Sequence, residues 1–526
     1  MAATPRRAAD TPESGIDMEN PEFRILLRLV EETNASIFLT GKAGTGKSTF
    51  LRYIISHTRK KHAVLAPTGI AAVNVGGQTI HSFFHLPLQP VLPDDPEFEP
   101  GRLRDRLNIT GRQIKLFREV ELIIIDEISM VRADVIDLVD RILRTFGGDR
   151  RKPFGGKQLL LVGDVFQLEP VVTTEDRNIL QHRYRHPFFF NARVFADFGL
   201  SSIELRKVYR QNETAFVEIL DRFRDGTPSH TDIQAINSRL TDSAQPDGDD
   251  SSRMVMTLAA RRDTVRRINA TMLEQIKARP VVYRGEVTGE FPESAYPTDL
   301  ELTLKPGAQV IFLRNDPERR FVNGTLGRVV AATDETLTVR LEDGTELDVE
   351  PVMWENVSYE YDSKNKTVAT HVKGTFTQYP VRTAWALTIH KSQGLTFDCV
   401  DIDLGGGAFA GGQVYVALSR CRSLDGIRLH TRIGAHDVFV NPEVIRFSRT
   451  FNDRREQEEA LRRAGAYRLL EEAAAAFDRA DFRTAVDKVH EAFLANPALN
   501  TPVMRRYISI RLTSALSRPV RKRRRK

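Results

Sequence analysis

The chain has 526 residues, 41% of them hydrophobic, and this length predicts roughly three to four domains rather than one core. Its formal charge is +6, yet residues 521–526 are all basic, and without these six the positive and negative side chains number 70 each. Overall basicity therefore does not by itself indicate a nucleic-acid groove. Cys399 and Cys421 form no metal-binding or disulfide pattern, and no apolar run approaches the ~18 residues of a membrane span. We therefore expect an intracellular protein.

The chain begins with residues 1–19, which are rich in Ala, Thr, Pro and Arg, lack hydrophobic periodicity and are expected to be a disordered lead-in. Residues 36–40 then predict a short buried strand, and residues 49–54 predict a helix. Residues 41–48 between them fit the pattern G-x-x-x-x-G-K-[ST]. A strand, a glycine loop and a helix in this order form the context that a phosphate-binding loop requires.

Each residue type in this loop has a physical role in holding a triphosphate. Glycines let the backbone N–H groups wrap around phosphates, and the helix N-terminus adds positive potential. Lys47 can reach the outer phosphates, and Ser48 can offer its hydroxyl to Mg²⁺. A glycine-rich turn without a ligand is the alternative, which the flanking strand and helix make improbable. The predicted nucleotide-binding residues are Gly41, Gly44, Thr45, Gly46, Lys47, Ser48 and Thr49.

A second strand-to-loop crossing follows at residues 62–72, with Pro67, Thr68 and Gly69 in the loop. Because ligands lie beyond the carboxyl ends of strands in an open parallel sheet, this loop faces the same rim as the first. A hydroxyl and a glycine there suit contact with a nucleic-acid phosphate, although Thr68 could equally be an ordinary helix N-cap. His81 and Phe83 approach the same rim, where an aromatic side chain is more often part of the core. Residues 85–120 depart from the pattern as a small, wedge-like excursion.

The clearest acidic site comes at the end of an aliphatic run, residues 121–127. A strand buried on both faces delivers Asp126 toward a Mg²⁺ shell and Glu127 toward a water that it can orient or deprotonate. A helix cap is the structural alternative for this pair. A further buried strand, residues 158–164, leads to Gln167, which can reach the terminal phosphate.

Taken in order, these motifs resemble those of superfamily 1 helicases, and their wording is most similar to the Pif (petite integration frequency) family, superfamily 1B DNA helicases related to the RecD helicases. The resemblance spans about residues 20–429 and includes a second half with three further motifs. Its quoted segments are residues 41–48, 66–72, 126–130, 163–168, 205–211, 388–396 and 416–420. No Gln that could contact adenine precedes Ile37, where Arg24 stands nearby.

The resemblance implies an α/β fold of two RecA-like P-loop NTPase domains with parallel sheets and with ATP and Mg²⁺ between them. It implies a DNA helicase that moves 5′-to-3′ on single-stranded DNA and unwinds forked duplex DNA, placed in the cytoplasm with the nucleoid or in a nucleus. The implied catalytic residues are Lys47, Asp126, Glu127, Gln167, Arg210 and Arg420, with Ser48 and Asp126 on Mg²⁺ and Gly394 at the nucleotide. The implied DNA-binding residues are Pro67, Thr68, Gly69, His81, Phe83, His390, Lys391 and Ser392.

The expected domains are residues 20–204 for the first RecA-like domain, with residues 205–300 and 374–450 for the second. Alternating patterns and turns at residues 301–373 predict small-barrel strands, which by resemblance form an SH3-like insert that helps to hold the DNA strand or serves as a packing module. Residues 451–500 predict a helical extension that resembles one tetratricopeptide hairpin. A lone hairpin must either pack on the two RecA-like domains, here called the motor, or dock a protein partner. Packing is the favoured alternative.

The basic tail, residues 501–526, is expected to be a mobile arm that neutralises phosphates, with a solubility tail or a nuclear-localisation signal as alternatives. A second class of function also stays open, an ATP-driven translocase or protein remodeller that separates no strands. A groove that follows the backbone does not exclude RNA either. Duplex unwinding, measured beside ATP hydrolysis stimulated by single strands, distinguishes these functions.

Overall fold

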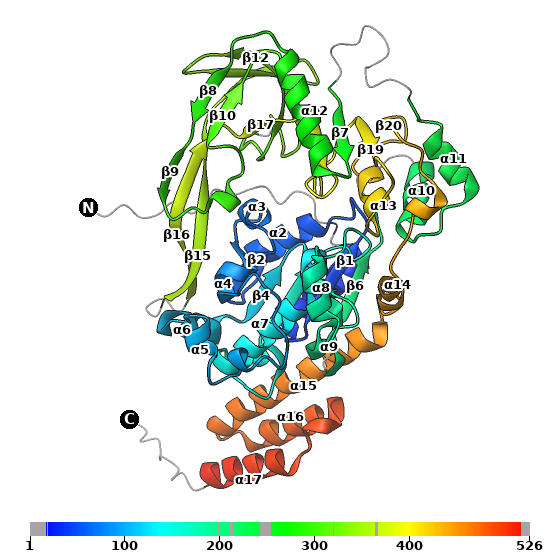
Figure 1. Ribbon diagram of the computed structural model, residues 1–526. Coiled ribbons are helices and arrows are strands. Elements are labelled where there is room, and N and C mark those ends of the chain that lie inside the picture. Colours follow the sequence, from blue (N-terminus) through cyan, green and yellow to red (C-terminus); the bar gives the residue numbers. More distant parts are fainter. Residues whose placement is uncertain are drawn as a thin grey trace.

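The computed structural model describes residues 17, 19–197, 199–209, 214–241, 254–318, 320–362 and 367–516 (Figure 1). Most of the predicted lead-in, the tail beyond residue 516 and Arg210 therefore lie outside the described residues. Two parallel sheets flanked by helices, an antiparallel β insert and a helical C-terminal part make up the described chain. This arrangement confirms the predicted fold class.

The first domain is built on a six-stranded parallel sheet with the order β3-β2-β4-β5-β1-β6. Its central strands are continuous aliphatic runs, because helices cover both faces of a parallel sheet. In β4, Leu122 and Ile124 pack on the side of α1 and α2, whereas Ile123 and Ile125 pack on the side of α7. The strands are β1 Ile37–Gly41, β2 His62–Ala66, β3 Gln78–Thr79, β4 Leu122–Ile125, β5 Gln158–Val162 and β6 Ser201–Leu205.

The helices of the first domain include the predicted excursion, residues 85–120, which is a packed helical segment. Leu103 and Phe117 are fully buried in the core beside the sheet. The helices are α1 Pro21–Glu32, α2 Lys47–His57, α3 Gly69–Asn74, α4 Ile80–Phe84, η1 Pro96–Phe98, α5 Leu103–Arg106, α6 Gly111–Glu119, η2 Ile128–Met130, α7 Ala133–Phe146, η3 Pro153–Gly156, α8 Thr174–Leu180, η4 Phe189–Asn191 and α9 Arg193–Asp197.

The second domain has a four-stranded parallel sheet with the order β18-β7-β19-β20. Its core also takes in Leu168, which follows β5 of the first domain, so the two domains are packed together. The strands are β7 Met256–Ala259, β18 Ala386–Thr388, β19 Val400–Asp403 and β20 Ile427–Leu429. The helices are α10 Thr214–Arg224, α11 His230–Asn237, α12 Arg262–Gln275, α13 Gln413–Leu418, η6 Ala435–Asp437 and α14 Pro442–Ser448.

The β insert lies between β7 and β18 and extends on both sides of the predicted residues 301–373. Its sheets have the orders β14-β13-β12-β11-β17, β10-β8 and β15-β16-β9. The elements are β8 Val281–Arg284, β9 Glu286–Gly289, η5 Glu293–Ala295, β10 Glu301–Leu304, β11 Gln309–Phe312, β12 Leu326–Ala332, β13 Leu337–Leu341, β14 Glu346–Val349, β15 Val352–Asp362, β16 Thr367–Gln378 and β17 Val381–Thr383.

The long hairpin of β15 and β16 runs from the insert down to the first domain, where β15 contacts α6 (Figure 1). There the Tyr359 hydroxyl accepts the N–H of Val64 in β2 at 3.1 Å. The insert therefore touches both RecA-like domains.

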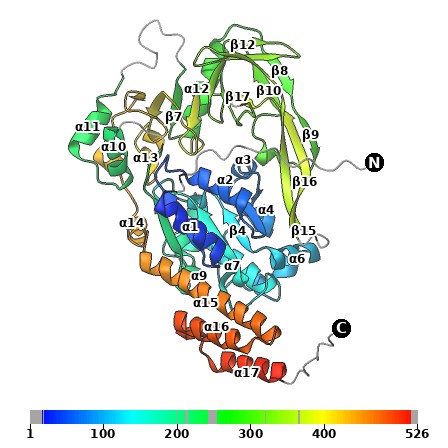
Figure 2. The ribbon, with the colours of Figure 1, turned by 180° about the vertical axis from the view of Figure 1, so that it is seen from behind.

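The helical C-terminal part consists of α15 Arg454–Asp478, α16 Phe482–Ala495, η7 Pro497–Leu499 and α17 Pro502–Leu516. Ala460 and Leu461 of α15 pack against the core that contains α1, and Figure 2 shows the two helices side by side. The first part of α15 therefore packs on the first RecA-like domain, whereas packing of the hairpin itself stays a prediction. The prediction that the tail begins at residue 501 is wrong, because α17 continues the helical part and Ile508 packs on the α15–α16 pair. None of the described helices is long and apolar enough to span a membrane.

Candidate functional site

The phosphate-binding loop lies at the carboxyl end of β1, where the chain turns into α2. Gly41, Gly44 and Gly46 have φ angles of 153°, 81° and 91°, in the region that favours glycine. A Cβ on Gly41 would also lie 2.8 Å from the carbonyl oxygen of Leu205, so no side chain fits there. The loop and the first turn of α2 bring together all the predicted nucleotide-binding residues of the first domain, Gly41, Gly44, Thr45, Gly46, Lys47, Ser48 and Thr49.

The ammonium of Lys47 is held by carbonyl oxygens of its own loop. Its Nζ donates to Gly41 O at 2.6 Å and to Lys42 O at 3.0 Å. Burial lowers the pKa of Lys47, whereas the charges of Asp164 and Glu127 oppose this shift. Within the described part of the chain, Lys47 donates hydrogen bonds to loop carbonyls and none to a carboxylate. A phosphate oxygen is therefore a suitable partner for its charge.

The acidic pair stands at the carboxyl end of β4, beside the loop. Burial raises the pKa of Asp126 and of Glu127, and the charge of Lys47 lowers both. Glu127 adopts a left-handed conformation, with φ 50° and ψ 43°, a strained state for a residue other than glycine and one that clusters at functional sites. Its side chain makes no capping hydrogen bond to η2, so the helix-cap alternative for Glu127 is wrong.

Gln167 stands where the two domains meet. Its Oε1 accepts a hydrogen bond at 3.3 Å from Nε2 of Gln393 in the second domain. Gly412, at the start of α13, approaches so closely that a Cβ there would lie 2.3 Å from Phe166 O. The loop that carries Gln167 is therefore in direct contact with the second domain.

The second-domain arginine of the site, Arg420, is buried and engaged with backbone carbonyls. It donates to Val416 O at 3.0 Å and to Leu395 O at 3.1 Å. Its charge lowers the pKa values of Lys47 and Glu127, so it lies within electrostatic reach of both. Gly394 has a φ of 79° and open space where a Cβ would be, and it directly precedes Leu395, whose carbonyl Arg420 contacts. The other predicted arginine, Arg210, lies outside the described residues.

The nucleic-acid residues predicted in the first domain differ in exposure. Thr68 is exposed and its Oγ1 accepts the N–H of Ala71, so the N-cap alternative is confirmed. Pro67 is half-buried, and Gly69 faces Ala295 of η5, because a Cβ on Gly69 would lie 2.7 Å from that side chain. The space predicted for a phosphate at Gly69 is therefore occupied by the insert in this arrangement.

The prediction that Phe83 contacts DNA is wrong. Its ring is 3% exposed and packs against Phe84, Phe117 and Tyr359, which confirms the alternative that it belongs to the core. His81 is half-buried, and burial together with Arg132 lowers its pKa.

In the second domain, His390, Lys391 and Ser392 follow β18. Ser392 is fully buried and donates to Ile389 O at 2.8 Å, so the prediction that Ser392 binds DNA is wrong. His390 is half-buried and Lys391 is exposed. Burial lowers the pKa of both, and the positive charge of Arg262 lowers each further.

Lys391 lines a basic cavity that we did not predict from the sequence. The cavity has a volume of about 310 Å³ and lies between α12, β17 and β18. Its cations are Arg262 and Arg266 on α12, Arg382 on β17 and Lys391. Two arginine pairs, residues 261–262 and 266–267, lie one helical turn apart, and this spacing was the signal available in the sequence. Besides burial, the charges of Arg382, Arg262 and Arg266 lower the pKa of Lys391, and such a cluster of cations favours an anion.

Two more residues near the loop were not predicted. The N–H of Tyr209 donates to Gly44 O at 2.9 Å, and the Tyr209 hydroxyl accepts from Asn20 Nδ2 at 3.2 Å. Asn20 caps α1, whose Phe23 ring lies against Gly46. The side-chain amide of Asn20 and the phenol of Tyr209 thus lie beside the phosphate-binding loop, although no glutamine that could contact adenine precedes Ile37.

The residues present fit Mg²⁺ only together with a nucleotide. Ser48 and Asp126 could each supply one oxygen ligand, but the described residues contain no group of three or more His, Cys, Asp or Glu side chains that could hold a metal ion. Mg²⁺ is commonly held by one or two protein ligands together with substrate phosphates and water.

This fold and site define a P-loop ATPase with two RecA-like domains and its nucleotide site where they meet. A family model described as PIF1-like helicase matches residues 23–233. The chain is also 33% identical over 440 residues to the ATP-dependent DNA helicase Pif1 of Bdellovibrio bacteriovorus, an alignment that covers 82% of this chain and 92% of that protein. The chain therefore belongs to the PIF1-like helicase family.

The resemblance extends to a eukaryotic relative and to solved structures. Human ATP-dependent DNA helicase PIF1 is 32% identical, and the alignment covers 79% of this chain but 61% of the human protein. The Bacteroides sp Pif1 structure in complex with ADP-AlF4 is 38% identical, with a TM-score of 0.74, and the match covers 82% of this chain and 96% of that chain. Bacteroides Pif1 bound to ssDNA is 37% identical, with a TM-score of 0.58 and the same coverage.

Proposed function

We propose that this ATP-dependent DNA helicase moves 5′-to-3′ along single-stranded DNA and separates duplex DNA ahead of it. The observation that carries the proposal is the contact that Gln393 and Gly412 of the second domain make with the Gln167 loop of the first. A nucleotide at this interface touches both domains, so its binding and hydrolysis change how the domains meet. By the same proposal, the protein acts on DNA at the nucleoid of a prokaryote or in the nucleus of a eukaryote.

Each residue of the site in the first domain has its own role in ATP hydrolysis. Lys47 leaves its loop carbonyls and binds the β- and γ-phosphates, where its charge offsets the charge that develops during transfer. Glu127 orients the attacking water and accepts its proton, while Gln167 contacts the terminal phosphate. Ser48 and Asp126 would hold Mg²⁺ together with phosphate oxygens, and the ion would supply further positive charge there.

The second domain contributes arginines, as the family resemblance implies for Arg210 and Arg420. A guanidinium suits this role because it stays charged and meets two phosphate oxygens at once. Arg420 must exchange its carbonyl partners, such as Leu395 O, for a phosphate oxygen, which couples nucleotide binding to the segment that carries Lys391.

The DNA strand crosses the second domain at the basic cavity. Arg262, Arg266, Arg382 and Lys391 supply phosphate contacts, which are independent of base sequence. Thr68 and Pro67 continue the path on the first domain, where the insert must withdraw Ala295 before a phosphate can approach Gly69. The protein partner predicted for the C-terminal hairpin remains a prediction.

A strand-displacement assay tests the proposal. The full chain is given ATP and Mg²⁺ with duplexes that carry a single-stranded tail at the 5′ or the 3′ end, in DNA and in RNA. We expect displacement of 5′-tailed DNA and none with Lys47→Ala. Displacement of 3′-tailed duplexes alone would contradict the polarity. Rapid ATP hydrolysis without any displacement would favour the translocase or remodeller instead.

A further inference from the structure

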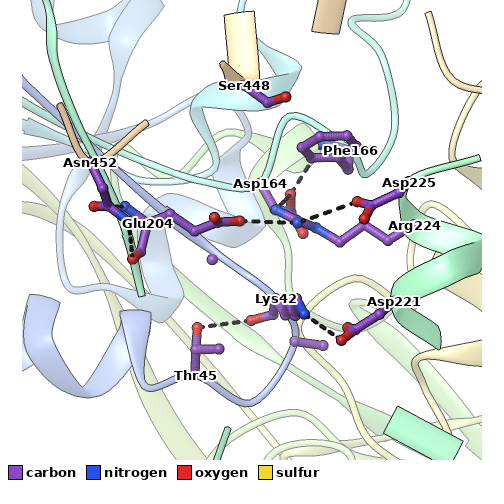
Figure 3. Close-up of polar contacts among 12 residues, drawn as sticks. Lys42, Thr45, Asp164, Phe166, Glu204, Asp221, Arg224, Asp225, Ser448 and Asn452 are labelled. Atoms are coloured by element: carbon purple, nitrogen blue, oxygen red, sulfur yellow. Dashed lines mark hydrogen bonds and ion pairs between the residues drawn. The ribbon is translucent and has the colours of Figure 1, made fainter. Parts of the chain in front are cut away.

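Arg224 crosses the boundary between the two domains. It is the last residue of α10, whose apolar side packs in the core of the second domain, yet its side chain is 4% exposed and points into the first domain (Figure 3). One guanidinium nitrogen lies 3.3 Å from Oδ1 of Asp164, and another lies 3.0 Å from Oε1 of Glu204. The guanidinium carbon also lies 4.1 Å from the centroid of the Phe166 ring.

Two of these partners belong to the turn that presents Gln167. The carboxylate of Asp164 accepts the N–H of Phe166 at 3.1 Å, and the carbonyl of Asp164 accepts the N–H of Gln167 at 3.0 Å. Arg224 therefore holds both the anchor of the turn, Asp164, and the ring next to Gln167. The third partner, Glu204, lies on the edge strand β6 and keeps the guanidinium oriented toward the first domain.

The phosphate-binding loop is held from the same side. The Tyr415 hydroxyl on α13 accepts the N–H of Ala43 at 3.4 Å and donates to Oδ2 of Asp164 at 3.5 Å. Lys42 forms an ion pair with Asp221, one turn before Arg224 on α10 (Figure 3). Second-domain helices thus contact both the loop that binds phosphate and the turn that carries Gln167.

The chemistry of the contact requires an arginine. A planar guanidinium can meet two carboxylates at its edges while its face rests on an aromatic ring, whereas an ammonium is a point charge that does not stack in this way. Asp164 is 1% exposed, and a buried carboxylate without its cation is unfavourable. An ordinary structural pair lies two residues earlier, where Arg222 bonds Asp232 of its own domain at 2.7 Å.

We propose that Arg224 is a positioning residue for ATP hydrolysis, which fixes the turn from Asp164 to Gln167 against the second domain so that Gln167 meets the terminal phosphate. The inference rests on the proposed function, since it concerns the same hydrolysis. Because Arg224 acts through Gln167, its loss lowers kcat and leaves nucleotide binding by the loop nearly unchanged.

The first test compares Arg224→Gln and Arg224→Lys with the matched control Arg222→Gln in the full chain. We expect kcat with saturating single-stranded DNA to fall on the order of 10- to 100-fold in both Arg224 variants, as misplaced catalytic groups do. The KM for ATP should change by less than about threefold, because binding energy is not removed. The control should match the wild type. Arg224→Lys keeps the buried charge balanced, so it provides the test even if Arg224→Gln does not fold. A kcat equal to that of the wild type in Arg224→Lys would overturn the proposal.

A double-mutant cycle with Gln167→Ala separates positioning from mere stability. If Arg224 acts through Gln167, adding Arg224→Lys to Gln167→Ala should lower kcat by less than about twofold further. Full additivity of the two losses would overturn the proposal, because Arg224 would then act elsewhere. The wild type and Lys47→Ala are measured beside these variants. Absence of ATP hydrolysis in the wild type would contradict the proposed function itself, whereas an active wild type with additive variants contradicts only the role of Arg224.

Discussion

Asn452 bonds both backbone groups of Glu204 with its side-chain amide, accepting the N–H at 3.0 Å and donating to the carbonyl at 3.1 Å (Figure 3). The N–H of Asn452 also donates to Ser202 O at 2.9 Å, so this segment covers the edge strand β6. Edge strands expose unpaired backbone groups, which makes such a cover stabilising. Since the Glu204 carboxylate meets Arg224, the start of the C-terminal helical part is joined to the contact between the domains.

Substituting Asn452 should therefore destabilise the protein. Asn452 has a φ of 58°, so Asn452→Ala loses two hydrogen bonds and strains the backbone, which together cost about 2–4 kcal/mol. Asn452→Gly loses the same bonds without the strain and should cost about 1–2 kcal/mol. Chemical denaturation of the two variants and the wild type measures this difference. Equal stability of all three would contradict the role of the cover.

Lys47→Ala should abolish ATP hydrolysis and leave binding of single-stranded DNA largely intact. The reason is that Lys47 touches the phosphate-binding loop alone, whereas the basic cavity lies on the second domain. Turnover and DNA affinity are measured on the same preparation, with circular dichroism to verify the fold. Turnover near that of the wild type would show that residues 41–48 are not the nucleotide site.

Arg420→Ala should lower turnover on the order of a hundredfold, as expected for an arginine that stabilises the transition state. Nucleotide affinity should fall less. Arg422→Ala is the matched control, because Arg422 is half-exposed and pairs with Asp398 at 2.8 Å. Arg210→Ala should resemble Arg420→Ala. If both variants hydrolyse ATP normally, the interface between the domains is not the site of hydrolysis.

The pH dependence of turnover should report Glu127. Burial and the Asp126 carboxylate raise the pKa of Glu127 above its ordinary 4.5. Because the base must be ionised, kcat should decline on the acid side at a higher pH than an ordinary glutamate would produce. The same shift stabilises the fold below the unfolded-state pKa, and that stabilisation is lost as the pH rises through the folded-state pKa.

The measurement is kcat against pH with saturating ATP and DNA. Binding of a fluorescent ATP analogue to Glu127→Gln over the same range separates titration of the nucleotide from that of the enzyme. A constant kcat down to about pH 5 would show that Glu127 is not the base.

Substitutions in the basic cavity should weaken DNA binding without altering the saturated rate of ATP hydrolysis. Arg262→Ala and Arg382→Ala each remove a cation that lines the cavity. Each should lower the slope of log affinity against log salt by about 0.7 for every phosphate of a single strand that is no longer neutralised. Arg340→Ala is the control, since Arg340 pairs with Glu346 on the insert. An unchanged salt slope in the cavity variants would mean that DNA takes another path.

The parts of this protein that were predictable from sequence are those in which neighbours along the chain decide the outcome. The loop at residues 41–48 needs glycines at particular φ angles followed by a helix, and both are local properties. The strands before Asp126 and Gln167 are aliphatic runs whose burial on both faces follows from their composition. Their order along the chain, together with the later motifs, was enough to identify the family and its two-domain fold.

Tertiary structure alone decided which of these side chains face one another. Phe83 and Ser392 belong to segments at the predicted rim, yet packing buries them, and no local pattern distinguishes an inward from an outward residue there. Arg224 and Asp164 are 60 residues apart, and Arg262 and Lys391 come from segments separated by the whole insert. Such pairs form because two domains and a β insert pack against one another, and the free energy of that packing depends on contacts that sequence spacing does not encode.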